Sequence, residues 1–131
     1  FVICLLAGFR IANPAQIPLA ILFMVLISLM FTAFGTAIAS VMSDFQGFQL
    51  VMNFLVMPIF FLSGALFPLM GLPKILNFLA IIDPLSYGVD GLRSAFAGVA
   101  HFGLATDLAL LFVLSAIALA AGTYLFSRIQ L

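Results

Sequence analysis

Few side chains in the sequence are able to do chemistry, and three amides form the clearest pattern among them. Gln46, Gln49 and Asn53 recur at i, i+3 and i+7, which places their side chains on one face of an α-helix. The surrounding stretch is apolar, and an amide left unpaired in hydrocarbon is costly. We therefore expect this face to meet protein or water, as the lining of a transport pathway does. The candidate pathway residues are Gln49, Asn53, Phe60 and Phe61.

The remaining polar groups do not form a catalytic constellation. Asp90 and Arg93 stand at i, i+3, which predicts a local ion pair, with a transported-ion site as the alternative. His101 has no ligand-type cluster beside it in the sequence, so a metal site or a catalytic base is not expected there. The sequence holds no phosphate-loop motif, no paired carboxylates at helical spacing and no cluster of Cys or His. We expect neither an enzyme nor a cofactor or metal bound by this chain.

Composition indicates an integral membrane protein. Hydrophobic residues make up 66% of the 131 residues and charged residues 6%, whereas about a quarter of a soluble domain is charged. The net charge is zero and no basic run occurs, so no nucleic-acid partner is expected. The lone Cys4 excludes a disulfide within the chain.

The apolar stretches predict an all-α, polytopic helical bundle with the lipid bilayer around it. We predict full spans over residues 18–42, 48–67 and 107–127, each long enough to cross the hydrocarbon core. Pro58 is expected to kink the second of these spans, because it removes a backbone hydrogen bond. Residues 1–10 are expected to be the end of a truncated helix. A cleavable signal peptide in residues 1–16 is the alternative, but the stretch lacks a basic start and a small-residue cleavage site.

A stripe of small and hydroxyl side chains runs along the first full span. In lipid such stripes mark the face on which helices pack closely, so we predict a helix contact there, with substrate contact as the alternative. The predicted packing residues are Ser28, Thr32, Gly35, Thr36 and Ser40.

The stretch from 57 to 93 is apolar but repeatedly broken by Pro and Gly, in pieces shorter than the roughly 20 residues that cross a bilayer. Broken backbone at membrane depth needs protein or a water-filled cavity around it. We therefore predict a re-entrant helical hairpin over residues 68–100, made of two short helices, 74–82 and 85–97, with Asp83 as the N-cap of the second. The predicted gate residues are Pro68, Pro73, Asp83, Pro84, Tyr87, Asp90 and Arg93.

The order of motifs in this stretch resembles a known family. LSGALFPL is followed by a Leu-Pro pair, a short apolar helix and DPLSYGVDGLR, which is similar to the C-terminal half of the permease subunit of type-2 ABC (ATP-binding cassette) transporters. The resemblance implies that residues 48–67 line the pathway, that residues 66–98 form an external gate, and that the turn at 43–47 faces the cytoplasm. It also implies a partner ATPase subunit that holds ATP and Mg, and a second permease copy in a homodimer.

We therefore expect the permease of an ATP-driven exporter in a bacterial or archaeal cell membrane, moving an amphipathic, drug-like, lipid or polysaccharide-type substrate. The basic residues of the chain argue against the orientation that the resemblance implies. Positive side chains are usually enriched on the cytoplasmic side, but Arg10, Lys74 and Arg93 would be external and only Arg128 internal. An ion-coupled secondary transporter is one alternative, although residues 18–42, 48–67 and 108–126 hold no acidic or basic side chain. A membrane-embedded enzyme or a non-transporting assembly subunit is the other.

Overall fold

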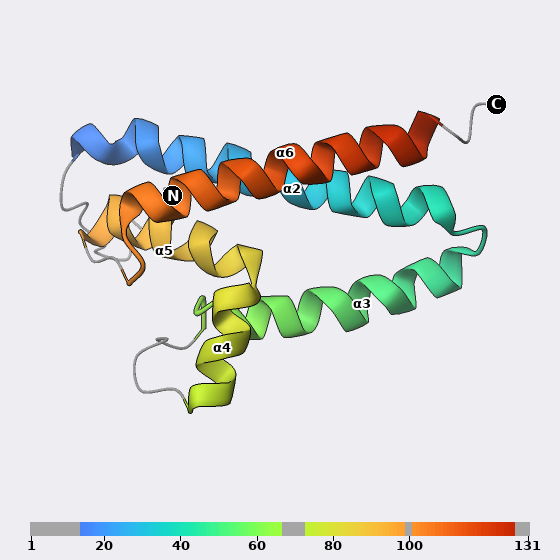
Figure 1. The fold of residues 1–131 in the computed structure, drawn as a ribbon, viewed down its shortest axis with the longest axis horizontal. Coiled ribbons are helices and arrows are strands. Elements are labelled where there is room, and N and C mark those ends of the chain that lie inside the picture. The colour runs from blue at the N-terminus through green and yellow to red at the C-terminus, as the bar shows by residue number, and fades with distance from the viewer. Residues whose placement is uncertain (1–13, 67–72, 99–100, 128–131) are drawn as a thin grey trace, which may run out of the picture.

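The computed structural model describes residues 14–66, 73–98 and 101–127, and within these ranges the chain is helical without any strand. A short 3-10 helix, η1 (Pro14–Gln16), leads into five α-helices (Figure 1). The α-helices are α2 (Ile17–Val41), α3 (Phe45–Leu62), α4 (Lys74–Ile82), α5 (Pro84–Ala97) and α6 (Leu104–Ser127). Three of them, α2, α3 and α6, are long and apolar enough to cross a membrane. The predicted all-α membrane fold is confirmed. The predicted helix end at 1–10 and the gate residue Pro68 lie outside the described residues.

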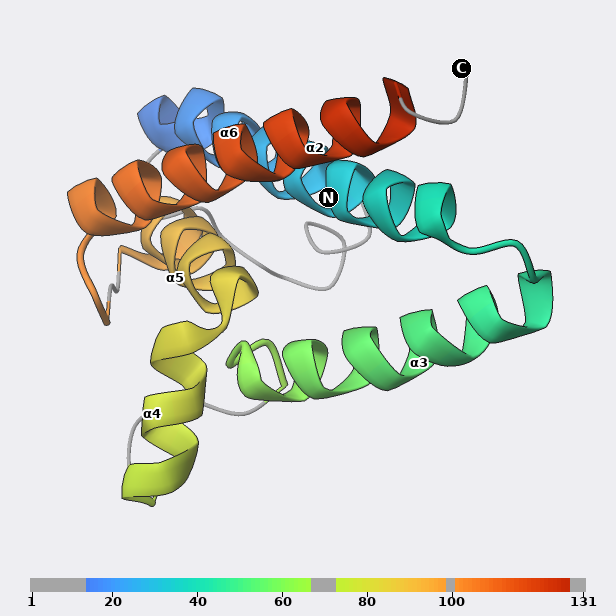
Figure 2. The same ribbon diagram turned by 45° about the vertical axis from the view of Figure 1, so that its right-hand side comes forward.

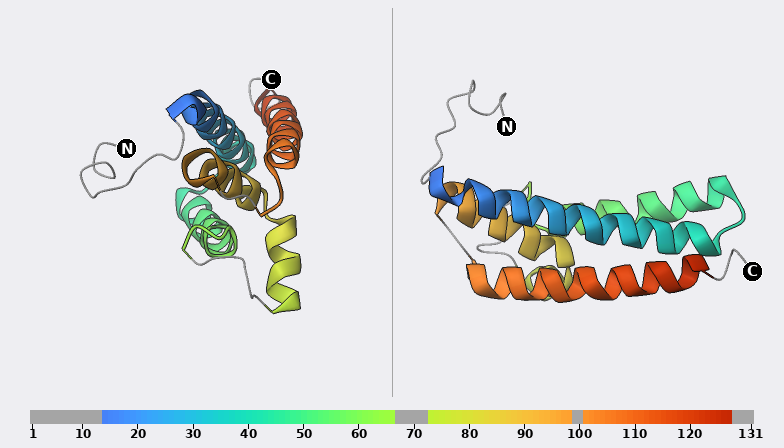
Figure 3. Two further views of the ribbon diagram at one scale, coloured as in Figure 1. Left: turned by 90° about the vertical axis from the view of Figure 1, so that its left-hand side faces the viewer. Right: turned by 90° about the horizontal axis from the view of Figure 1, so that it is seen from above.

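The core lies between α2 and α6, which run side by side in the same direction (Figures 1 and 3). The contact is made by apolar side chains at helical spacing, and Ser115 Oγ donates a hydrogen bond of 3.1 Å to the Leu26 carbonyl across it. A Cβ added at Gly122 would lie 3.0 Å from the Ala33 carbonyl oxygen, so this glycine is where the two backbones come closest. The core cluster comprises Phe23, Leu26, Met30, Ala33, Leu111 and Ala118.

Helix α5 packs against both α2 and α6 through glycines. A Cβ added at Gly91 would come within 2.2 Å of the Phe23 ring, and one at Gly88 within 2.6 Å of Ile27. Phe23 is fully buried and has no room to move aside. The small residues of α5 are therefore what allows it to approach α2.

Helix α3 returns alongside α2 after a short turn but stands apart from it, and none of its residues is buried. It begins at Phe45, three residues before the predicted start, because the Asp44 side chain caps it by accepting from the Gly47 N–H at 2.7 Å and the Gln46 N–H at 3.3 Å. It ends at Leu62, five residues before the predicted end, and the turn that follows contains Gly64 with φ 76°. Positive φ is the backbone conformation that glycine adopts without strain.

Helices α4 and α5 meet at Asp83 with a bend of 88° and fit a re-entrant element (Figure 2). Asp83 caps α5 by accepting from the Leu85 N–H at 3.0 Å, and Pro84 occupies the first helical position, where no N–H is needed. Gly98 closes α5 with φ 70°. Both short helices thus form where the sequence predicted them, α5 starting one residue earlier.

Helix α6 starts at Leu104 rather than at 107. Asp107, the first residue of the predicted span, consequently lies inside the first turn of the helix with a fully buried side chain.

Candidate transport pathway and re-entrant gate

Three of the four predicted pathway residues lie on one face of α3. Gln49, Asn53 and Phe60 fall within one narrow stripe at 3.6 residues per turn, and all three are exposed. This stripe is turned roughly 90° away from the α3 face that lies toward α2, which carries Met52 and Ile59 among others. The amides therefore face out of the described bundle and not into it.

Phe61 lies to one side of this stripe and contacts Phe60. Their ring centroids are 6.2 Å apart with an interplanar angle of 72°, an edge-to-face arrangement. Their side chains are 41% and 53% exposed respectively, so neither is held in the core of this chain. Pro58 lies inside α3, in the turn before this pair.

The end of α3 and the turn that follows it approach two polar side chains of the re-entrant helix α5. Arg93 donates from Nη2 to the Gly64 carbonyl at 2.8 Å, and Ser86 Oγ lies 3.4 Å from the Leu62 carbonyl. Gly64 lies in the turn that follows α3, and a hydrogen bond donated to its carbonyl by a charged guanidinium is stronger than one between neutral groups. The phenylalanine pair is thereby fixed next to the predicted gate.

A second group of hydrogen bonds holds the corner between α4 and α5. Ser86 Oγ donates to Asp83 Oδ2 at 3.2 Å, and the Tyr87 hydroxyl donates to the Ile81 carbonyl at 2.5 Å. Burial raises the pKa of Asp83 to about 6, against the bonds from Leu85 N and Ser86 Oγ, which lower it. Three predicted gate residues, Asp83, Pro84 and Tyr87, thus build one rigid corner.

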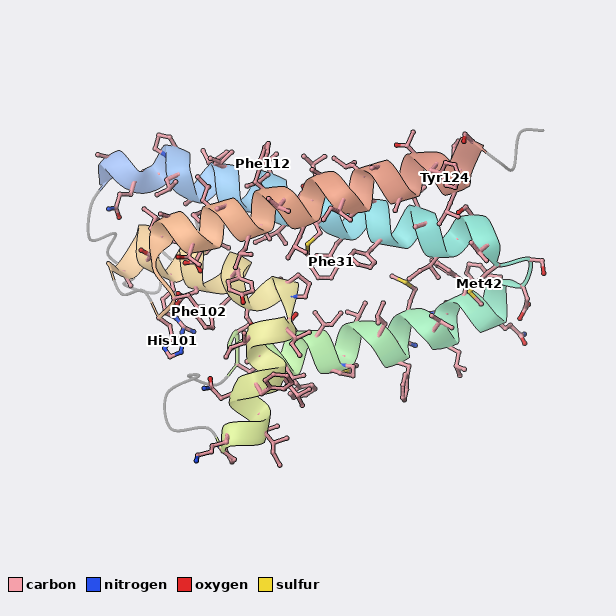
Figure 4. The ribbon with its side chains drawn as sticks, in the orientation of Figure 1. Phe31, Met42, His101, Phe102, Phe112 and Tyr124 are labelled. Atoms are coloured by element: carbon pink, nitrogen blue, oxygen red, sulfur yellow. The ribbon has the colours of Figure 1, made fainter. Side chains whose placement is uncertain are left out.

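The predicted ion pair between Asp90 and Arg93 is not formed. Asp90 is buried and accepts hydrogen bonds from two backbone N–H groups instead. The His101 N–H lies 2.9 Å from Oδ1 and 2.7 Å from Oδ2, and the Phe102 N–H lies 2.8 Å from Oδ2. Arg93 is engaged with Gly64. Each charge has found backbone partners in place of the other charge, because the loop after α5 folds back onto it (Figure 4).

Asp107 is the one buried acid that sequence reasoning missed. Its side chain is fully buried, and neither carboxyl oxygen accepts a hydrogen bond from the residues that the structure describes. The sequence signal was present, since an acid that follows a short polar loop directly before an apolar span can fall inside the first turn of the helix. The described residues contain no group of three or more His, Cys, Asp or Glu that could hold a metal ion.

The side-chain hydrogen bonds of the predicted packing stripe on α2 all stay within that helix in the described part of the chain. Ser28, Thr36 and Ser40 donate to carbonyls of their own helix at 2.9, 2.8 and 2.7 Å, and a Cβ added at Gly35 would meet nothing within 4 Å. Thr32 borders, with Gly122 and Thr123 of α6 among others, a shallow hollow of about 220 Å³. The role of the stripe as a packing face stays a prediction, and the open space around Gly35 leaves room for a helix of another chain.

A small apolar cavity of about 150 Å³ separates α3 from α2. Its walls are the inward face of α3, three residues of α2 and Pro84 from the start of α5. Phe31 of α2 lies in this gap (Figure 4). Helix α3 therefore rests on α2 through a loosely filled apolar layer, in contrast to the close α2–α6 contact.

The family of the chain follows from a comparison with family models. The model described as ABC-2 type transporter matches residues 1–97, which include α2, α3 and the whole of the bent pair. The chain belongs to the ABC-2 type transporter family. Members of this family form the membrane component of a transporter and do not themselves catalyse a reaction. The resemblance drawn from the sequence is thereby confirmed. Comparison with characterised proteins and with solved structures gives no match.

Proposed function

We propose that this ABC-2 family member is the permease of an ATP-driven exporter, with the exposed stripe of α3 lining the pathway. The observation that carries the proposal is that α3, long and apolar enough to span, has no buried residue and exposes Gln49 and Asn53. Amides at membrane depth require protein or water beside them. A second permease copy, facing this one across α3, supplies such a surface.

The substrate class follows from the two ends of the stripe. The amides occupy the part of α3 near the Ser43 turn, and Phe60 and Phe61 occupy the part next to the re-entrant element. An apolar constriction excludes water and ions by dewetting, whereas aromatic rings can move aside for an apolar molecule. The proposed substrate is therefore amphipathic: a drug-like compound, a lipid or a lipid-linked polysaccharide.

The energy source lies outside this chain in the proposal. The sequence has no phosphate-loop motif, so ATP and Mg are assigned to a partner ATPase subunit or domain that docks at the cytoplasmic face. The assembly is a homodimer in a bacterial or archaeal cell membrane. The turn at Ser43 faces the ATPase, and the bent α4–α5 pair faces outward.

One observation favours a second candidate, an ion-coupled transporter. Asp107 lies inside α6, whereas the sequence had suggested spans without acidic or basic residues. A buried acid in a span is a feature of ion-coupled transport. The family match favours ATP as the energy source, and an ion gradient is an outcome of the test below.

The test is transport in vesicles that contain the complete permease and its ATPase. We expect Phe60→Ala or Phe61→Ala to alter the export rate or substrate range, and Asn53→Leu to reduce export, while ATP binding by the partner stays unchanged. Phe112→Ala is the matched control, because Phe112 is 63% exposed and lies on α6, away from the α3 stripe. Wild-type rates and range in both phenylalanine variants at equal expression would refute the plug. Transport driven by an ion gradient without ATP would favour the second candidate.

A further inference from the structure

Two buried acids meet where α5 packs on α6. Asp90 is 2% exposed and Asp107 is fully buried. Asp90 accepts from the backbone N–H groups of His101 and Phe102, whereas neither oxygen of Asp107 accepts a bond from the described residues. An ionised carboxylate buried without a partner is so unfavourable that such groups become neutral instead.

Asp90 binds the N–H groups of His101 and Phe102, which lead directly into α6, and Asp107 lies in the first turn of that helix, so both acids are buried at the same end of the α5–α6 contact. Two ionised carboxylates are acceptors only and cannot form a hydrogen bond, whereas a proton on one makes it a donor. We propose that Asp90 and Asp107 form a proton-binding site, in which Asp107 is the neutral acid and donates to the Asp90 carboxylate.

The surroundings decide which of the two holds the proton. Bonds from backbone N–H groups stabilise a carboxylate in its charged form, and Asp90 has three such contacts between 2.7 and 2.9 Å. Asp107 has none from the described residues, so a charge on it would be buried without any partner. The proton therefore resides on Asp107.

No described cation neutralises the pair. On α5, the Arg93 guanidinium is bound to the Gly64 carbonyl. Tyr87 contributes a hydroxyl group and Asp83 at the helix start a carboxyl group, and neither of these can be a cation. The His101 ring is exposed and lies edge-on to the Phe102 ring, with centroids 4.7 Å apart. Helix α2, the third element of the core, has no titratable residue. The pair also offers too few ligands for a hard cation such as Ca²⁺, which takes 6–8 oxygens, because the Asp90 carboxylate is already hydrogen-bonded to backbone N–H groups.

Loss of the proton would place two adjacent negative charges in the α5–α6 contact. The folded protein then holds a proton that an unfolded, water-exposed Asp releases, so the number of bound protons is higher in the folded state. Stability must fall as pH rises, because its slope against pH is set by the protons bound unfolded minus those bound folded. The site makes the seating of the re-entrant helix dependent on pH.

The experiment is an infrared titration of the full-length permease with its ATPase in lipid nanodiscs, together with its melting temperature against pH. A protonated carboxylic acid has a carbonyl band that a carboxylate lacks. We expect this band in the difference between wild type and Asp107→Asn at neutral pH, and its loss at alkaline pH. The wild-type melting temperature should fall over the same range, and that of Asp107→Asn, a neutral donor, should not.

Asp44→Asn is the control, because Asp44 is exposed and lies in the turn at the other end of α2. Its difference spectrum should lack the band. A wild-type melting temperature that does not fall as pH rises would overturn the proposal without relying on any variant. The proposal would also be overturned if the difference spectrum between wild type and Asp107→Asn lacked the band at neutral pH. Asp107 would then be ionised, and its charge would be balanced by an inorganic cation or by a basic group of the complex. A rise in melting temperature with added salt would reveal the inorganic cation.

Discussion

At the scale of single residues, three of the described glycines pack tightly against a neighbouring helix, and Gly35 in the hydroxyl stripe does not. Gly88, Gly91 and Gly122 stand where a methyl group would meet a neighbouring helix within 3.0 Å. Gly35, in the middle of the stripe, meets nothing within 4 Å. Side-chain volume thus matters at some glycines of this chain and not at others, although the sequence around them is similarly apolar.

Gly91→Ala and Gly35→Ala form a matched pair that tests this difference. The added methyl at 91 would press on the buried Phe23 ring and should destabilise the protein by about 1–3 kcal/mol, as overpacking of a filled core does. At 35 the change should be neutral or stabilising by roughly 0.5–1 kcal/mol, the usual gain from glycine to alanine in a helix. Thermal unfolding in detergent measures both. Equal losses in the two variants would contradict the packing described here.

The link between Arg93 and Gly64 makes a second prediction at this scale. Arg93→Gln should cost about 1.5–3 kcal/mol, the range for a hydrogen bond made by a charged group, because the Gly64 carbonyl in the turn after α3 loses its charged donor. Lys74→Gln removes a positive charge from the exposed start of α4 and is the control. Melting temperatures and protease sensitivity of the 63–66 turn report the loss. An Arg93 variant as stable as the Lys74 variant would show that this link contributes nothing.

At the scale of elements, the bent pair α4–α5 decides the topology. The His101 loop and Met42, next to the α2–α3 turn, lie at opposite ends of the long axis of the molecule (Figure 4). The α4–α5 bend of 88° returns the chain to the end at which α6 begins, so that α3 and α6 can both span. The bent pair therefore fits a re-entrant element, which dips into the membrane region without crossing it.

Cysteine labelling tests this topology. In a background with Cys4 replaced, single cysteines at Lys74 and His101 should react with an impermeant thiol reagent from the same, external side. A cysteine at Ser43 should react only from inside. All three positions are exposed in the structure, so failure to react would not arise from burial within the chain. Labelling of Lys74 and His101 from opposite sides would show that the pair crosses the membrane.

The elements were largely predictable from sequence, and their contacts were not. The long stretches without charged residues predicted where the spans lie. The Asp-Pro pair at 83 and 84 predicted the start of α5, because a capping residue followed by proline strongly favours the first turn of a helix. The early end of α3 depended on a positive φ at Gly64, which an apolar pattern does not reveal. The partners of Asp90 and the burial of Asp107 depended on a loop folding back, which residue spacing along one helix cannot encode.

At the scale of the whole molecule, the chain presents two open faces. One is the α3 stripe with its amides, and the other is the hydroxyl stripe of α2 around Gly35. Apolar faces of a membrane helix are covered by lipid at no cost, whereas small and hydroxyl side chains gain from a close helix contact. Within the proposed homodimer, the α2 stripe is a candidate contact with a neighbouring helix.

Gly35→Leu separates assembly from folding at this scale. If the stripe packs on another chain, the variant should reduce the dimer fraction in native mass spectrometry or crosslinking while leaving the melting of the monomer unchanged, because the space around Gly35 is open within the chain. Leu22→Ala, at an exposed position of the same helix, is the control. Equal dimer fractions in the two variants would count against an interface there.

The central claim, that this ABC-2 family chain is the permease of an ATP-driven transporter, is tested most directly by ATP-dependent transport in vesicles. Vesicles holding the full-length permease and its ATPase are given a panel of fluorescent amphipathic lipids and dyes, with and without ATP. The account predicts ATP-dependent movement of at least one probe, abolished when the phosphate-loop lysine of the ATPase is replaced and reduced by Asn53→Leu. Movement that needs no ATP and follows an ion gradient would contradict it.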